Sequence, residues 1–203
     1  QVHHESHASQ SVFADRRQAW CGHRAARLGF RFTRAVHQLA ATRAALILRY
    51  AAKSDVGMVR KANEDSGFAG RSLLAVADGM GGHAAGELAS STAIATLAEL
   101  DSEDLPTESL LTALDDAIVT SAERIGQFID ADPTRAGMGT TVTAILWRAG
   151  RIAVIHVGDS RAYLLRAGEL TQITHDHTYV QSLIDAGRIT PDEARRHPKR
   201  NLL

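Results

Sequence analysis

The chain has 203 residues, a formal net charge of zero and 44% hydrophobic residues. This length allows one sizeable domain, and the hydrophobic content excludes a disordered or fibrous protein. A neutral total gives no bulk electrostatic reason to expect a nucleic acid or a charged membrane surface as partner. The longest wholly apolar runs, Ala44 to Leu48 and Leu73 to Ala77, are too short to cross a bilayer, which takes about 20 residues. Cys21 is the only cysteine, so no disulfide can form within the chain, and we expect a cytoplasmic protein.

The neutral total conceals a basic first quarter. Residues 1–50 contain eight Arg, no Lys and two acidic residues, whereas the rest of the chain has 15 basic and 21 acidic residues. The first segment also lacks a clear hydrophobic period before Ala40. We therefore expect residues 1–44 to be a basic extension, disordered or not native coding sequence, and residues 45–203 to be the folded domain. A nucleic-acid-binding arm and an organellar transit peptide are the alternatives, because both are rich in Arg.

From Ala45 onward the pattern predicts blocks of short strands and helices. Strands are expected at 45–52, 66–69, 72–78, 140–147, 151–157, 162–166 and 169–174, and helices at 86–100, 107–129 and 178–186. In the first helix, Leu88, Thr92, Ala95 and Ala98 repeat at helical spacing. A last helix begins after Thr190, because Thr190-Pro191-Asp192-Glu193 has the pattern of a capping box. Two helices between groups of antiparallel strands predict an α+β fold.

The most informative motif is Asp78-Gly79-Met80-Gly81-Gly82, which follows the apolar run Leu73 to Ala77. The run predicts a buried strand, and the glycines let the backbone turn sharply and approach a ligand closely. A carboxylate and an accessible carbonyl therefore lie at the end of this strand. Hard divalent cations prefer such oxygen ligands. For an isolated Asp-Gly pair, an acidic turn that ends a strand is the alternative.

Three further stretches carry polar residues near predicted strand ends: Val59 to Ser66, Gly137 to Thr141, and His156 to Arg161. Glu64 and Asp65 are neighbours in the first stretch, so on a strand they point to opposite faces and cannot both reach one metal directly. A solvated acidic pair and a surface arginine are the alternatives for the residues of this stretch.

Together the four stretches resemble, in order and spacing, the bacterial branch of the metal-dependent protein phosphatase family (PPM, type 2C). The resemblance runs from about Leu46 to the last residue. It implies a four-layer αββα sandwich that removes phosphate from phosphoserine and phosphothreonine in proteins. In this family the attacking water bridges two Mn²⁺ or Mg²⁺ ions. The implied partners are phosphorylated proteins and a Ser/Thr kinase with its substrates, and we expect a monomer without a nucleic-acid partner.

The resemblance also assigns site residues. Asp78 would bridge both ions, and the Gly79 carbonyl would bind one of them. Glu64 would bind the second ion, largely through water, while Asp65 would orient the surrounding waters. Arg60 would hold the substrate phosphate, since a guanidinium donates two parallel hydrogen bonds and stays charged.

A third and weaker metal site is implied at Asp159, with Asn201 as a second contributor. An ordinary ion pair between Asp159 and Arg161 is the alternative. Some family members place a histidine where this chain has Met80, and a thioether cannot deliver a proton. His175 and His177 have no family role, and we expect both on the surface.

Residues 178–200 correspond to the family's flap, a mobile segment beside the active site. Family members continue beyond this stretch with two more acidic motifs, which complete the first metal's ligands. Without these motifs we expect the sandwich to be incomplete at its C-terminus, the chain to be poorly stable, and its activity to be weak or absent. A catalytically inactive remnant that binds a phosphoprotein or a regulatory partner is the alternative.

Overall fold

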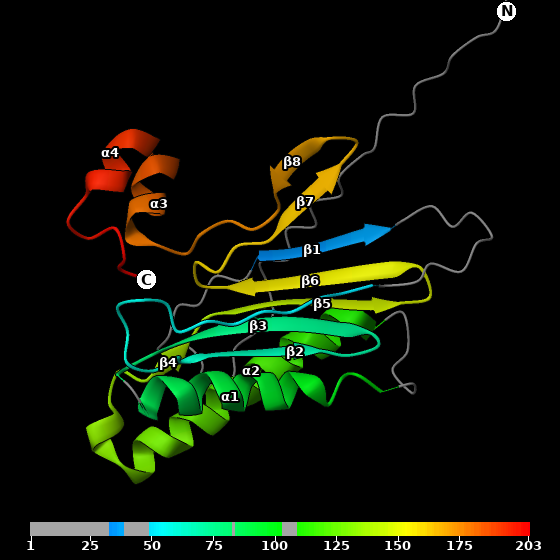
Figure 1. Cartoon of the computed structure of the whole chain (residues 1–203), viewed down its shortest axis with the longest axis horizontal. Helices are drawn as coiled ribbons and strands as arrows, with labels where there is room; N and C mark the ends of the chain where they lie inside the picture. The colour runs from blue at the N-terminus through cyan, green and yellow to red at the C-terminus, as the bar shows by residue number, and fades with distance from the viewer. Residues whose placement is uncertain (1–32, 39–48, 83, 103–108) are drawn as a thin grey trace, which may run out of the picture. The chain divides into compact units, whose positions relative to one another are not determined.

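The computed structural model describes residues 33–38, 49–82, 84–102 and 109–203 (Figure 1). Its strands are β1 (Thr33–Gln38), β2 (Asp65–Ala69), β3 (Leu73–Met80), β4 (Gly139–Thr140), β5 (Val142–Arg148), β6 (Arg151–Val157), β7 (Tyr163–Arg166) and β8 (Glu169–Gln172). Its helices are α1 (Ala84–Ala98), α2 (Leu110–Ala131), α3 (Tyr179–Asp185), α4 (Pro191–Arg196) and the short 3₁₀ helix η3 (Pro133–Arg135).

One antiparallel sheet organises the described residues. Its strand order is β1-β6-β5-β3-β2, and β4 pairs with the end of β3. The hairpin of β5 and β6 turns at Ala149 and Gly150, whose φ angles of 47° and 76° are those of a two-residue turn that matches strand twist. The strands β7 and β8 form a separate two-stranded sheet, in which all residues are exposed. The sheets and helices confirm the predicted α+β class.

The helices α1 and α2 cover one face of the large sheet (Figure 1). Along β3 the side chains alternate, so Leu73, Ala75 and Ala77 are buried towards the helices, whereas Val76 on the other face is 53% exposed. The core contains residues from both layers: Leu73, Ala75, Ala77, Ala93, Ile94, Leu97, Leu110, Leu114, Ala117, Ile118, Val142, Ala144, Leu146, Ala153 and Ile155. Of the four expected layers, the described residues thus contain one helical layer packed on one full sheet.

The buried face of α1 differs from the predicted one. Its buried residues are Gly86, Ala89, Ser90, Ala93, Ile94, Thr96 and Leu97. Ala95 is exposed, so the predicted stripe through Leu88, Thr92, Ala95 and Ala98 is wrong. The first two turns of α1 bury Gly86, Ala89 and Ser90 instead, whose small side chains permit close contact with the sheet.

The N-terminal predictions are tested only in part. Residues 39–48 lie outside the described part of the chain, and residues 49–52 have no regular structure, so the described half of the strand expected at 45–52 is not a strand. The backbone of β1, which lies within the segment expected as an extension, pairs with β6 in antiparallel register. The domain division at residue 44 stays a prediction. No helix in the described ranges is long and apolar enough to cross a membrane.

Asp101 joins the end of α1 to the turn between β2 and β3. Its carboxylate accepts hydrogen bonds from the backbone N–H groups of Arg71, Ser72 and Leu73 at 3.0, 2.6 and 3.2 Å, and from the Ser72 hydroxyl at 2.7 Å. Partial burial alone would raise the pKa of Asp101, but these hydrogen bonds from Ser72, Arg71 and Leu73 together hold it below its ordinary value. The ionised carboxylate therefore stabilises the fold.

Replacing this carboxylate with a neutral amide (Asp101→Asn) weakens four hydrogen bonds and should lower the free energy of unfolding at pH 7 by about 1–2 kcal/mol. A carboxylate with a lowered pKa stabilises the fold at pH values above its pKa in the unfolded chain, and this stabilisation is lost as pH falls through its pKa in the fold. The difference in stability between wild type and variant should therefore shrink below about pH 4. Urea unfolding at several pH values measures this. Asp116→Asn, at an exposed position of α2, is the control; equal effects of both variants would contradict the assignment.

Candidate active site

Asp78 and Asp65 face each other on adjacent strands. In the antiparallel register of β2 and β3, Asp65 is the direct partner of Asp78. Two like charges at paired positions destabilise a sheet unless a proton or a cation lies between them. Both residues are exposed at this edge, so a cation from solvent can reach them.

Two further predicted site residues, Asp159 and Arg60, influence the pKa of Asp78. The pKa of Asp78 lies above its ordinary value, first because of partial burial and then because of the negative charges of Asp65 and Asp159, while Arg60 acts in the opposite direction. These four residues come from the loop before β2, from β2 and β3, and from the turn after β6. Residues of three separate sequence motifs are thus near enough for the charges of Arg60, Asp65 and Asp159 to act on Asp78.

Glu64 lies beside Asp65 in the chain, but its carboxylate lies against the first turn of α1. Its carbonyl oxygen accepts hydrogen bonds from the Gly79 N–H at 3.2 Å and from the Ser90 hydroxyl at 2.6 Å. Its carboxylate occupies the space where a Cβ atom of Gly86 would lie, in the first turn of α1. This is the positive end of the helix dipole, which favours a carboxylate.

Gly79 and Gly86 form the point where the sheet and α1 come closest. A Cβ atom on Gly79 would collide with the carbonyl oxygen of Gly86 and would lie 2.7 Å from that of Glu64. Only glycine fits at residue 79. The glycines of the motif therefore permit the approach of α1, which fixes the place of Glu64.

Two threonines, whose roles the sequence did not indicate, hold the backbone of Asp78. The Asp78 N–H donates to the Thr141 hydroxyl at 3.0 Å, and the Asp78 carbonyl accepts from the Thr141 N–H at 2.9 Å and from the Thr140 hydroxyl at 3.0 Å. Thr141 is 2% exposed, and its hydroxyl also lies 2.7 Å from that of Ser160. This side chain thus links the strand end at Asp78 to the turn that carries Asp159.

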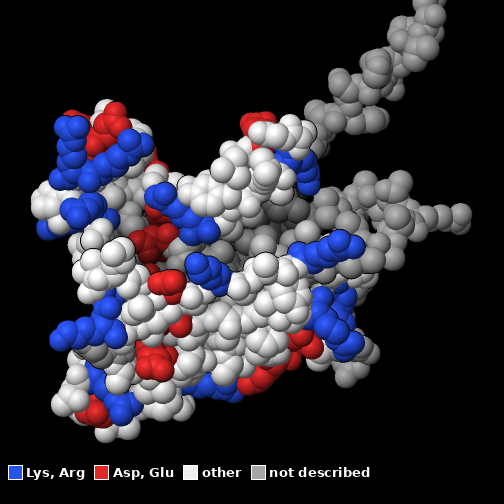
Figure 2. All heavy atoms as spheres, in the orientation of Figure 1, with Lys and Arg blue, Asp and Glu red and all other residues white. Residues whose placement is uncertain are grey.

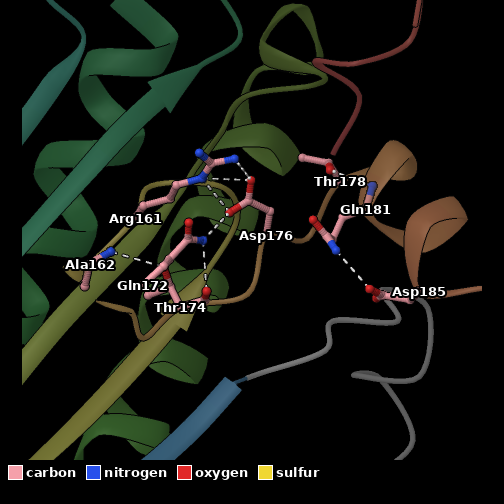
Figure 3. A network of polar contacts seen from close by, with 8 residues as sticks. All are labelled: Arg161, Ala162, Gln172, Thr174, Asp176, Thr178, Gln181 and Asp185. Atoms are coloured by element: carbon pink, nitrogen blue, oxygen red, sulfur yellow. Dashed lines mark hydrogen bonds and ion pairs between the residues drawn. The ribbon is translucent and has the colours of Figure 1, made fainter. Parts of the chain in front are cut away.

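The alternative ion pair between Asp159 and Arg161 is wrong. Arg161 instead binds Asp176 through Nε and Nη2, at 3.0, 3.1 and 2.6 Å, and the two side chains face each other in Figure 3. Asp176 also accepts from Gln172 at 3.3 Å and is only 9% exposed. Asp159 is exposed and makes no hydrogen bond or ion pair with the described residues. Its carboxylate is therefore available to an external ligand.

The turn after β6 is bound to the segment before α3 on two sides. The His177 N–H donates to the Gly158 carbonyl at 2.8 Å, and the Gly158 N–H donates to His177 Nδ1 at 3.2 Å. The Ala162 N–H donates to the Thr174 hydroxyl at 3.1 Å (Figure 3). His177 is half-buried, so the expectation that it lies on the surface is wrong, because its backbone and its ring both contact this turn. The other expected surface histidine, His175, is exposed.

The donor set fits a divalent cation of the Mg²⁺ or Mn²⁺ kind. Asp78 and Asp65 are paired across β3 and β2, the side chains of Asp78, Asp65 and Asp159 are all exposed, and Asp78 has a raised pKa that a bound cation would reverse. Among the described residues, however, no three His, Cys, Asp or Glu side chains form a preformed metal cluster. Asn201 and Asp159 both line a groove beside α3 and α4. The fold alone therefore brings few direct protein ligands together.

A family model described as Protein phosphatase 2C matches residues 50–185. The chain belongs to the protein phosphatase 2C family. It is 57% identical over 161 residues to serine/threonine protein phosphatase PstP of Mycobacterium tuberculosis (strain CDC 1551 / Oshkosh), over 79% of this chain and 31% of that protein. Serine/threonine phosphatase stp of Listeria welshimeri is 35% identical over 159 residues, covering 74% of this chain and 63% of that protein.

A solved structure of the same family contains metal. The catalytic domain of PstP in complex with two manganese ions matches with a TM-score of 0.64 and 48% identity, over 81% of this chain and 64% of that chain. The predicted family and its fold class are thus confirmed. The chain spans less than two thirds of each of these three relatives.

In metal-free buffer, Asp78→Asn should stabilise the chain, because it removes one of two facing like charges. We expect a gain of about 0.2–1 kcal/mol in the free energy of unfolding at pH 7. The raised pKa means that protonated Asp78 is favoured in the fold, so the wild type loses stability as pH rises from about 4 through the folded pKa, and the gain should appear over that range. Urea unfolding against pH measures this.

Addition of Mn²⁺ should reverse the order, because the cation stabilises wild type and not Asp78→Asn. Asp130→Asn, at an exposed position of α2, should respond to Mn²⁺ as wild type does. An Asp78→Asn variant that is less stable than wild type without metal would show that Asp78 has a structural partner instead.

Proposed function

We propose that this phosphatase 2C domain belongs to a protein that removes phosphate from phosphoserine and phosphothreonine in proteins with the help of Mn²⁺ or Mg²⁺. The observation that carries the proposal is the pairing of Asp65 with Asp78, with Asp159 and Arg60 close enough to change the pKa of Asp78. Phosphorylated proteins, among them a Ser/Thr kinase and its substrates, are the proposed partners. A monomer in the cytoplasm is the proposed state.

The residues have distinct roles in this proposal. Asp78 and the Gly79 carbonyl hold the cations, Glu64 contributes through water, and Asp65 orients the waters around them. Arg60 is exposed and makes no hydrogen bond or ion pair with the described residues, so its guanidinium is available to two phosphoryl oxygens. When bound, the cations neutralise the phosphoryl charge and acidify water.

Asp159 and Asn201 are proposed for a third, weaker cation position. Asn201 offers a carbonyl oxygen without charge, and Asp159 has no competing partner among the described residues. Met80 carries no exchangeable proton, so in this proposal a water molecule protonates the leaving alcohol.

Two observations favour a second candidate, an inactive remnant that binds a phosphoprotein or a regulatory partner. No cluster of three metal-ligating side chains is preformed in the described ranges. The sheet face opposite α1 and α2 exposes apolar side chains such as Val76. A chain that holds metal too weakly for turnover would still present the exposed Arg60 to a phosphoprotein.

Hydrolysis of a phosphothreonine peptide by residues 1–203 with Mn²⁺, measured as released phosphate, tests the first candidate. We expect slow turnover that Asp78→Ala abolishes. Loss of the two hydrogen bonds from the guanidinium in Arg60→Ala should lower kcat/KM about tenfold to a hundredfold. Lys61→Ala, at the exposed neighbour, should leave kcat/KM within about twofold of wild type.

Calorimetric titration with Mn²⁺ separates the two candidates. Micromolar binding that Asp78→Ala removes would support the enzyme, even where turnover is slow. The absence of both Mn²⁺ binding and phosphate release would support the remnant.

A further inference from the structure

A groove of about 570 Å³ lies between the turn that carries Asp159 and the helices α3 and α4. In Figure 2 this region is a hollow with acidic side chains inside and basic side chains around it. Its volume is within the range of about 300–1,000 Å³ that is typical of ligand sites. It is lined by Asp159, Arg161, Asp176, Thr178, Val180, Gln181, Ile184, Pro191, Ala194, Arg195, Arg200 and Asn201.

The floor of the groove is apolar and its walls are fixed. Val180 and Ala194 line the groove and are 9% and 6% exposed, so each contributes a small aliphatic area to it. The Thr178 hydroxyl accepts the Gln181 N–H at 3.2 Å and caps α3, and Thr190 forms a full capping box with Glu193 at the start of α4.

The opposite wall is held by the ion pair of Arg161 with Asp176 described above. This pair binds the segment before α3 to the turn that carries Asp159. It also neutralises Asp176 within the groove. The groove therefore exists before any ligand binds.

The outer rim is cationic. Residues 195–200 contain Arg195, Arg196, Lys199 and Arg200 and no acidic residue. The acidic residues just before them are already engaged: Glu193 accepts from the N–H and the hydroxyl of Thr190, at 2.7 and 2.9 Å, and Asp192 pairs with Arg195. That pair is 86% and 79% exposed, where an ion pair contributes little.

Arg200 is the cation with the clearest free capacity. It is exposed and makes no side-chain hydrogen bond or ion pair with the described residues. Lys199, its neighbour, lies 5.5 Å above the Tyr179 ring. Arg195 and Arg200 therefore present charge to the groove from two segments, α4 and the stretch after it.

We propose that this groove binds an acidic peptide segment with an aliphatic side chain, located next to the phosphorylated residue of a protein substrate. Carboxylates of the segment pair with Arg200 and Arg195, and the aliphatic side chain packs on Val180 and Ala194. The inner end of the groove reaches Asp159, so a peptide in it continues towards the site at Asp78. That this peptide belongs to a phosphatase substrate rests on the proposed function, whereas peptide binding by the groove does not.

The carboxylates in the groove argue for a peptide and against a nucleic acid. Asp159 at the inner end repels a continuous polyanion, whereas a peptide can place an aliphatic or neutral residue there. An apolar floor between two charged regions likewise matches a chain whose side chains differ from one residue to the next.

Fluorescence anisotropy of a labelled, unphosphorylated peptide of Glu and Leu residues tests the proposal in EDTA, where metal binding at Asp78 does not contribute. We expect saturable binding by residues 1–203 that weakens with salt. Arg200→Glu should weaken the binding, and the double variant Arg195→Glu with Arg200→Glu should weaken it by about tenfold or more. Arg188→Glu changes an exposed arginine outside the groove lining and should bind as wild type does.

Equal losses in Arg188→Glu and Arg200→Glu would overturn the proposal, because a general charge effect would then explain the binding. Equal affinity for a single-stranded DNA of the same charge would also overturn it. Far-UV circular dichroism confirms that each variant is folded. Asp78→Ala should retain peptide binding in EDTA. Failure of the proposed phosphatase activity can therefore be told from failure of the proposed peptide binding, because the activity depends on Asp78 and the binding on Arg200.

Discussion

The register between β2 and β3 is the constraint on which the rest of the site depends. It places Asp65 directly opposite Asp78, and a slip of one residue would turn one of the two carboxylates to the other face of the sheet. The register is held at this end by backbone bonds, from the Gly79 N–H to the Glu64 carbonyl and between Asp78 and Thr141. The fold thus uses neutral groups to keep two like charges together, which stabilises the protein only when a cation or a proton is also present.

The close approach of α1 to the end of β3 explains why the first two turns of α1 contain small residues. Gly79 must approach the carbonyl of Gly86, and Ser90 must reach the carbonyl of Glu64, so the first two turns of α1 lie against the strand ends. Larger side chains on this face would move the helix away and release Glu64 from the helix N-terminus. Packing of the core and placement of the acidic residues are therefore one constraint.

Features that depend on residues close together in the chain could be predicted from the sequence. The β6 boundaries and the Thr190 capping box depend on residues close in sequence, and the structure has them as expected, whereas β3 continues two residues beyond the expected end at Asp78, to Met80. The buried face of α1 was wrong because its small residues carry little hydrophobic signal. Long-range partners were also missed: Arg161 binds Asp176, 15 residues away, and not its near neighbour Asp159. Thr141 likewise acts on a residue 63 positions away.

The ion pair of Arg161 with Asp176 affects both the groove and the turn that carries Asp159. It removes one carboxylate from the electrostatic field of the groove, and it leaves Asp159 without a competing cation. The remaining charges are then separated in space, with carboxylates at the strand ends and guanidinium groups on and after α4. A formal net charge of zero conceals this separation. The guanidinium groups therefore suit the acidic peptide proposed above, while the carboxylates at the strand ends suit the proposed cations.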